Sequence, residues 1–243
     1  ICMGAQWMVA GFVHGVLNTD NINITGESFD YGPWRFAPHF DPKFTAAYFD
    51  ETGLYAFGRQ PETLLWNLTR LAECLLPLSE QTKLEAVLGE FEGIIQREFA
   101  TQILRRLGLK SLSHEADTKL ASAVVQFLIK TRAPFEQFFF DWYCGLASRE
   151  RAAKSEGAEF YKREEFEPVF AAMSQFEATG NLDHPYFARA VPCTMLIDEV
   201  EALWRPIAER DDWLPLEQKI IAVRRMGDAH GTKPVPAGHG GGV

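Results

Sequence analysis

The sequence predicts a mainly α-helical domain with one small β-hairpin near its amino terminus. Three observations support this fold class. Apolar residues recur with the period of amphipathic helices over most of the chain after Pro61. Proline and glycine stand where these helical patterns begin or end. In the part of the chain before these helical patterns, Ile22-Asn23-Ile24 alternates apolar and polar residues, which is typical of a β-strand.

The predicted hairpin spans residues 22–29. Residues 22–24 form its first strand, Thr25-Gly26-Glu27 supplies the turn, and Ser28-Phe29 begins the return strand. Because a short hairpin brings its two ends together, we expect the flanking residues Asn21 and Asp30 to lie side by side.

The remaining predicted elements are helices. A helix over residues 62–76 has its apolar residues at the spacing of one buried face, with Pro61 suited to its first turn and Pro77 after its end. Ser79 is a suitable N-cap for a long amphipathic run that stops at Gly108. The same signals predict further helical segments over residues 5–10, 113–133, 135–143, 166–176, 194–208 and 216–226.

The chain is long enough to bury a substantial core, with 243 residues of which 47% are hydrophobic. We assign residues 1–231 to one helical domain. We expect residues 232–243, which are rich in glycine and proline, to be disordered. Residues 135–143 include six aromatic side chains, for which a helix packed into an aromatic core is the expected arrangement and a stacking platform for a base the alternative.

Composition excludes several classes of partner. The net charge is −9 and no run of Lys or Arg occurs, which argues against nucleic acid. No apolar stretch approaches the roughly 18 residues of a membrane span. The cysteines Cys2, Cys74, Cys144 and Cys193 form no C-x-x-C pair, which favours a reducing, cytoplasmic setting without structural zinc.

The residues best suited to divalent metal and phosphate chemistry are Asp20, Asn21 and Asp30, which fall within eleven positions of each other. Carboxylate and amide oxygens form the hard site that Mg²⁺ prefers when phosphates complete its coordination. The alternative is a turn rich in Asn and Asp, because these side chains bond readily to nearby backbone. The hairpin spacing favours a metal site at Asn21 and Asp30.

The order of these residues is similar to that in protein kinases, where a catalytic loop H-R-D-x-x-x-x-N precedes D-F-G. His14 and Asn21 are seven positions apart, as in that loop, and Asp30-Tyr31-Gly32 stands in the place of D-F-G. Val16 occupies the position of the kinase catalytic Asp and can accept no proton. A carboxylate stands instead at Asp20, directly before the metal-binding Asn.

This combination resembles the SelO family, which comprises selenoprotein O and its bacterial relatives. These kinase-like proteins act as protein adenylyltransferases. The resemblance extends through about residue 78 and rests on four segments: Gly11–Asn21, Phe29–Pro33, Tyr55–Pro61 and Leu65–Leu68.

The resemblance implies transfer of AMP from ATP to Ser, Thr or Tyr hydroxyls of protein substrates, with Mg²⁺ or Mn²⁺. By motif, Asp20 would be the proton acceptor, and Asn21 and Asp30 the metal ligands. Asp30 would also meet the nucleotide phosphates through the metal. The helical part would be the C-terminal lobe of a kinase-like fold.

The sequence contains no G-x-G-x-x-G loop and no strand with a phosphate-binding Lys. We therefore expect a fragment without the N-terminal nucleotide-binding lobe, inactive by itself. Adenylyl and phosphoryl transfer are both in-line displacements at phosphorus, so these residues leave phosphate transfer open as an alternative. A second alternative is an inactive scaffold similar to a pseudokinase.

Neighbouring polar residues are assigned supporting roles. His14 is expected to pack and brace the loop backbone rather than to act as a base. Asn18 and Thr19 can brace the loop as well and are assigned no chemistry. For Arg59 and Gln60, support of the segment after Asp30 and contact with substrate are both open.

Overall fold

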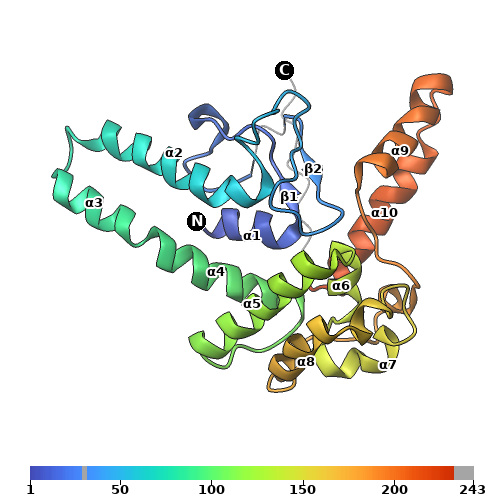
Figure 1. Ribbon diagram of the computed structural model, residues 1–243. Helices are drawn as coiled ribbons and strands as arrows, with labels where there is room; N and C mark the ends of the chain where they lie inside the picture. Colours follow the sequence, from blue (N-terminus) through green and yellow to red (C-terminus); the bar gives the residue numbers. More distant parts are fainter. Residues whose placement is uncertain (29–31, 233–243) are drawn as a thin grey trace.

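The computed structural model describes residues 1–28 and 32–232 and confirms a mainly helical fold with one small antiparallel pair of strands (Figure 1). The strands are β1 (Phe12–Val13) and β2 (Arg35–Phe36). The helices are α1 (Cys2–Ala10), α2 (Gln60–Leu75), α3 (Gln81–Gly89), α4 (Phe91–Arg106), α5 (His114–Thr131), α6 (Phe135–Asp141), α7 (Arg149–Ala152), α8 (Glu167–Met173), α9 (Ile197–Arg210) and α10 (Leu214–Ala229).

The strand pair lies outside the predicted hairpin. Phe12 pairs with Phe36 and Val13 with Arg35, so β1 and β2 close a loop over residues 14–34. The prediction of strands at 22–24 and 28–29 is wrong for its described part, where residues 22–28 form no ladder. Only the turn is present, with the Gly26 amide 3.0 Å from the Asn23 carbonyl oxygen.

The physical reason lies in the environment of the predicted strand. Ile24 is 82% exposed, so its side chain finds no apolar layer against which a strand could pack. The Asn23 carboxamide accepts a hydrogen bond from the Thr25 amide at 3.2 Å. This local bond favours a turn over an extended strand.

Helix α1 leads directly into β1. Gly11 ends the helix in the left-handed conformation, with φ of 67°, and its amide is 3.3 Å from the Met8 carbonyl oxygen. The helix is buried between α4 and α2, with Trp7, Met8 and Val9 all inside the core. The start of the 14–34 loop is therefore anchored to a buried helix.

The long helical run predicted after Ser79 is broken into α3 and α4, which meet at Glu90. Gly89 at the end of α3 has a low helix propensity. The two halves also differ in burial, because α3 has no buried residue while α4 buries its apolar face. The other predicted helices are present, with ends shifted by a few residues.

The aromatic residues of 135–143 form the centre of the core, as the core interpretation predicted. Six aromatic side chains of this segment are buried: Phe135, Phe138, Phe139, Phe140, Trp142 and Tyr143. They contact rings from α5, the segment before α8, and the segment before α9. Figure 1 shows α9 and α10 side by side at the end of the described chain. Residues 233–243, most of the predicted tail, lie outside the described residues.

Candidate active site

The candidate site is the loop over residues 14–34, and its first residue is fixed by packing. His14 has no exposed surface, and its ring lies 5.5 Å from that of Trp7 and 6.3 Å from that of Phe12, measured between centroids. This burial agrees with the expected bracing role of His14.

The two arms of the loop touch at Gly15. A Cβ atom at this position would lie 2.0 Å from the Pro33 carbonyl oxygen, and the backbone φ of Gly15 is +84°. Only glycine tolerates both the close approach and the left-handed conformation. Gly15 therefore allows the segment that follows Asp30-Tyr31-Gly32 to lie directly on the start of the loop.

Asp20 and Asn21 are presented together on a 3₁₀ turn, Thr19–Asn21. The Asn21 amide donates to the Asn18 carbonyl oxygen at 3.1 Å. Asp20 is exposed and Asn21 is half-buried. The structure thus places on one turn the two residues to which the family resemblance gives the roles of proton acceptor and metal ligand.

Asp30, together with Phe29 and Tyr31, lies outside the described residues, so its approach to Asn21 stays a prediction. Both described flanks of this segment are anchored near the site. On one side, the Trp7 indole nitrogen donates to the Ser28 hydroxyl at 3.1 Å. On the other side, Pro33 lies against Gly15.

Helix α2 supplies two buried amides to the loop. The Gln60 carboxamide accepts from the His14 amide at 3.0 Å and donates to the Phe12 carbonyl oxygen at 2.9 Å. The Asn67 carboxamide donates to the Leu17 carbonyl oxygen at 2.8 Å. Gln60 therefore supports the start of the loop, and no hydrogen bond described for it reaches the segment after Asp30, the support of which was one of the two roles left open for it.

Sequence reasoning missed the part that Asn67 plays. Its position carried a signal, because residue 67 is three positions after Leu64 and falls on the buried stripe of α2. A carboxamide on an apolar stripe requires a hydrogen-bond partner inside the protein. The sequence offers no indication that this partner would be backbone 50 residues earlier.

Other contacts fix the outer edge of the loop. The Tyr55 hydroxyl donates to the Asn18 side-chain oxygen, which gives Asn18 the bracing role considered for it. Arg59 is exposed and pairs with Glu62 at 3.1 Å, and this contact raises the pKa of Arg59 and lowers that of Glu62. Arg59 therefore belongs to the solvent face of α2 rather than to its contact with the loop.

The buried carboxylate of Asp141, outside the loop, has structural partners. Asp141 accepts hydrogen bonds from Gln137, Ser155 and Tyr161 at 2.7, 2.6 and 2.7 Å, while burial raises its pKa. This network joins α6 to the segment after α7 and includes none of the predicted site residues. Among the described residues, no group of three or more His, Cys, Asp or Glu side chains is placed to hold a metal ion.

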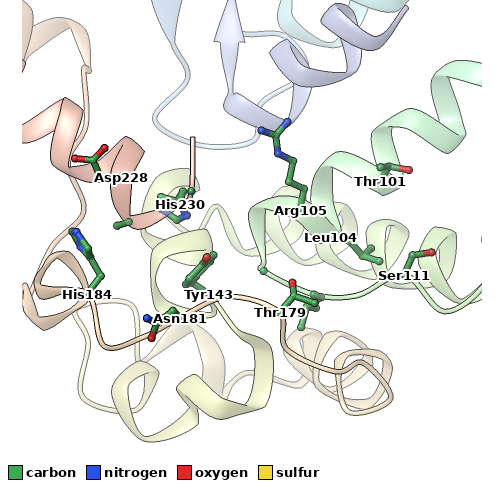
Figure 2. A pocket seen from close by; sticks show the side chains of 15 residues that line it. Thr101, Leu104, Arg105, Ser111, Tyr143, Thr179, Asn181, His184, Asp228 and His230 are labelled. Carbon is green, nitrogen blue, oxygen red and sulfur yellow. The ribbon is translucent and has the colours of Figure 1, made fainter. Parts of the chain in front are cut away.

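A separate cavity of about 590 Å³ lies between the end of α4 and the end of α10 (Figure 2). Arg105, Tyr143, Asn181, His184 and His230 are among its lining residues, and none of the predicted site residues is. The ring of His230 lies 4.7 Å from that of Tyr143 and 5.5 Å from that of Phe187. This packing indicates a structural role for His230.

Comparison with known proteins decides the family. The family model described as "Protein adenylyltransferase SelO" matches residues 2–224, which is nearly the whole chain. The chain belongs to the SelO family. The resemblance seen in four short motifs is thereby confirmed and extended well beyond residue 78, through helices that carry no recognisable motif.

Relatives within the SelO family are named "Protein nucleotidyltransferase YdiU". That of Trichodesmium erythraeum is 36% identical over 218 residues, covering 87% of this chain and 46% of the relative. That of Trichormus variabilis is 32% identical over 239 residues, covering 92% of this chain and 49% of the relative. That of Vibrio atlanticus is 40% identical over 137 residues. The chain spans about half the length of the first two of these relatives. No described helix is both long and apolar enough to span a membrane.

Proposed function

We propose that this chain carries the metal-binding and proton-accepting part of a protein adenylyltransferase site. The observation that carries the proposal is the match of the SelO family model to residues 2–224, which includes the whole 14–34 loop. The geometry of the loop is compatible with it, because the exposed Asp20 carboxylate and the Asn21 amide share one turn. We further propose that the helical body is the C-terminal lobe of a kinase-like fold.

The donor set suits a hard divalent cation. Asn21 contributes an amide oxygen and Asp30 a carboxylate, and such oxygens are the ligands that Mg²⁺ and Mn²⁺ take together with phosphates. When bound, the cation would neutralise negative charge on the phosphates of ATP. Asn21 and Asp30 are the residues proposed to hold it.

Asp20 is proposed to accept the proton of the attacking hydroxyl. In the reaction, a Ser, Thr or Tyr oxygen of the protein substrate forms a bond to the α-phosphorus of ATP. The bond from that phosphorus to the bridging oxygen of the β-phosphate breaks, and pyrophosphate leaves. The hydroxyl proton passes to the Asp20 carboxylate, which the turn holds in the open.

The test uses the complete gene product that contains this chain, incubated with protein substrates, Mg²⁺ or Mn²⁺, and ATP labelled at either the α or the γ phosphorus. Label transferred from the α position supports adenylyl transfer. Label transferred only from the γ position would show a phosphotransferase, and the absence of both would indicate a scaffold.

Two substitutions test the assigned residues. Asp30→Ala should abolish labelling by removing a metal ligand. Asp20→Ala should retain nucleotide binding while lowering the transfer rate by about 10²- to 10⁴-fold, the usual contribution of a general base. Asp198→Ala, which removes an exposed carboxylate from the first turn of α9, is the matched control and should label normally. Full activity of Asp30→Ala would contradict the assignment.

A further inference from the structure

We propose that Gln60 and Asn67 of α2 are positioning residues for the transfer site, holding the backbone that presents Asp20 and Asn21. The expected effect of these two residues on the transfer reaction rests on the proposed function. The contacts themselves are independent of it, because they join described residues on two elements that lie far apart in the sequence.

Gln60 uses both ends of its carboxamide. The side-chain oxygen faces the His14 amide, a donor, and the side-chain nitrogen faces the Phe12 carbonyl oxygen, an acceptor. These two backbone partners fix the orientation of the carboxamide. A residue without a donor and an acceptor side by side cannot replace both contacts. Gln60 has no exposed surface, so solvent cannot replace them either.

Asn67 acts two turns further along the same helix. Its side-chain nitrogen donates to the Leu17 carbonyl oxygen at 2.8 Å and to the Thr63 carbonyl oxygen at 2.9 Å. Leu17 is itself buried, with 1% of its surface exposed. It stands immediately before Asn18, whose carbonyl oxygen accepts the Asn21 amide in the turn that bears the candidate site.

The two contacts bracket the segment that needs support. Residues 14–18 form neither helix nor strand, so their own backbone supplies little to define their position. Gln60 holds the beginning of this segment and Asn67 holds its end. A helix is a more precise support for a reacting group than a free loop. Loss of either contact should therefore shift the Asp20 carboxylate relative to the substrate, while the carboxylate itself stays present.

The charge state of a Gln60→Glu variant offers a specific test. A protonated carboxyl group has a donor beside an acceptor, as the carboxamide does. An ionised carboxylate has acceptors only, so it cannot donate to the Phe12 carbonyl oxygen that it would face. The ratio of its kcat to that of wild type should approach one at low pH. It should fall by about 10- to 100-fold as the introduced carboxyl ionises, as expected for a small misplacement of the reacting groups.

Three comparisons make the test specific to positioning. The KM for ATP should change little in Gln60→Glu, because the residue contacts the loop backbone and not the nucleotide. Gln60→Leu should have a low kcat at every pH. Gln96→Glu is the matched control, since Gln96 is exposed on α4 and bonds to Glu92, and its activity ratio should not vary with pH.

Amide hydrogen exchange in the same complete protein provides a readout without turnover. Exchange over residues 14–21 should be faster in Gln60→Leu and in Asn67→Leu than in wild type, with no change in Gln96→Leu. Wild-type exchange rates in both α2 variants, or a pH-independent activity ratio for Gln60→Glu, would overturn the inference. Absence of transfer by the wild-type protein would instead overturn the proposed function, and the exchange rates would still decide whether α2 holds the loop.

Discussion

At the scale of single residues, Gly15 is the position where the smallest change should have a large effect. Its backbone φ of +84° disfavours any other residue, and an added Cβ would lie 2.0 Å from the Pro33 carbonyl oxygen. Gly26 has a similar φ of +78°, but nothing lies within 4 Å of an added Cβ there. Comparing substitutions at Gly15 and Gly26 therefore separates the cost of steric overlap from the cost of the backbone conformation.

We expect Gly15→Ala to lower the free energy of unfolding by clearly more than Gly26→Ala. The left-handed backbone alone costs about 1–2 kcal/mol for a non-glycine residue, and this applies to both variants. Only Gly15→Ala must also separate the two arms of the loop. Urea denaturation followed by circular dichroism measures the difference. Equal losses of stability would show that the contact between Gly15 and Pro33 is not tight.

The loop motif predicted a bracing His14, which the structure buries, whereas the catalytic and metal-binding roles of Asp20, Asn21 and Asp30 stay predictions. Burial of His14 and the adjacent placement of Asp20 and Asn21 follow from the loop pattern. The roles of Gln60 and Asn67 did not follow, because each binds backbone atoms 46 to 50 positions away. A backbone carbonyl or amide is the same at every residue, so no side-chain pattern marks such a partner.

At the scale of elements, Arg106 connects three helices. It lies at the end of α4, donates to the Val9 carbonyl oxygen in α1, and pairs with Glu136 in α6. Its guanidinium carbon also lies 4.2 Å from the ring centroid of Phe139. The planar group thus binds in two directions while it stacks on an aromatic face, which an ammonium group cannot reproduce.

Arg106→Lys should consequently destabilise the protein by about 2 kcal/mol, although the charge is retained, because at least one hydrogen bond to a charged group is lost. Arg105→Lys is the matched control. Arg105 is the preceding residue, is exposed, and forms no ion pair with any residue of the described ranges 1–28 and 32–232. Thermal unfolding of both variants measures the effect. Similar melting temperatures for Arg106→Lys and Arg105→Lys would contradict the contact of Arg106 with three helices.

The elements themselves show what periodicity can and cannot predict. Helical spacing predicted helices such as α4 and α5, whose apolar stripes are buried. The predicted strand at residues 22–24 failed because alternation alone does not provide a surface to pack against, and Ile24 is left in solvent. The true strands have two residues each, which is too short for any period to be visible in the sequence.

At the scale of the whole molecule, the C-terminal helical pair is joined to the core through an aromatic cluster. Phe140, Tyr143, Tyr186 and Phe187 pack together, and His230 at the end of α10 contacts three of these rings. Burial lowers the pKa of His230 to about 4, and Arg106, Arg151 and His184 nearby also lower it, against the opposite effect of Glu136. The neutral imidazole is therefore the form that fits the folded protein.

This pKa predicts a pH dependence of stability. An unfolded histidine titrates near 6.5, so between pH 4 and 6.5 the unfolded chain binds more protons at this residue than the folded protein does. The contribution of His230 is complete above pH 6.5 and is lost as the pH falls towards 4, by up to about 3 kcal/mol.

The measurement compares wild type with His230→Phe, which keeps a ring in the cluster but cannot be protonated. The difference between their free energies of unfolding should change with pH only across this interval. His114→Gln, a change of an exposed histidine at the start of α5, should follow the wild-type profile. A constant difference between wild type and His230→Phe would show that this histidine does not couple protonation to folding.

The hydrogen bonds from α2 also bear on the order of events during protein synthesis. Residues 12–17 leave the ribosome well before the residues that hold them, because Gln60 and Asn67 are made 46 to 50 positions later. The nascent chain therefore cannot complete the support of the 14–34 loop from local interactions, and contacts this distant in sequence form slowly. Asp20, the proposed proton acceptor, should reach its final position only once α2 has docked, so the proposed reaction would have to wait until the surrounding fold exists.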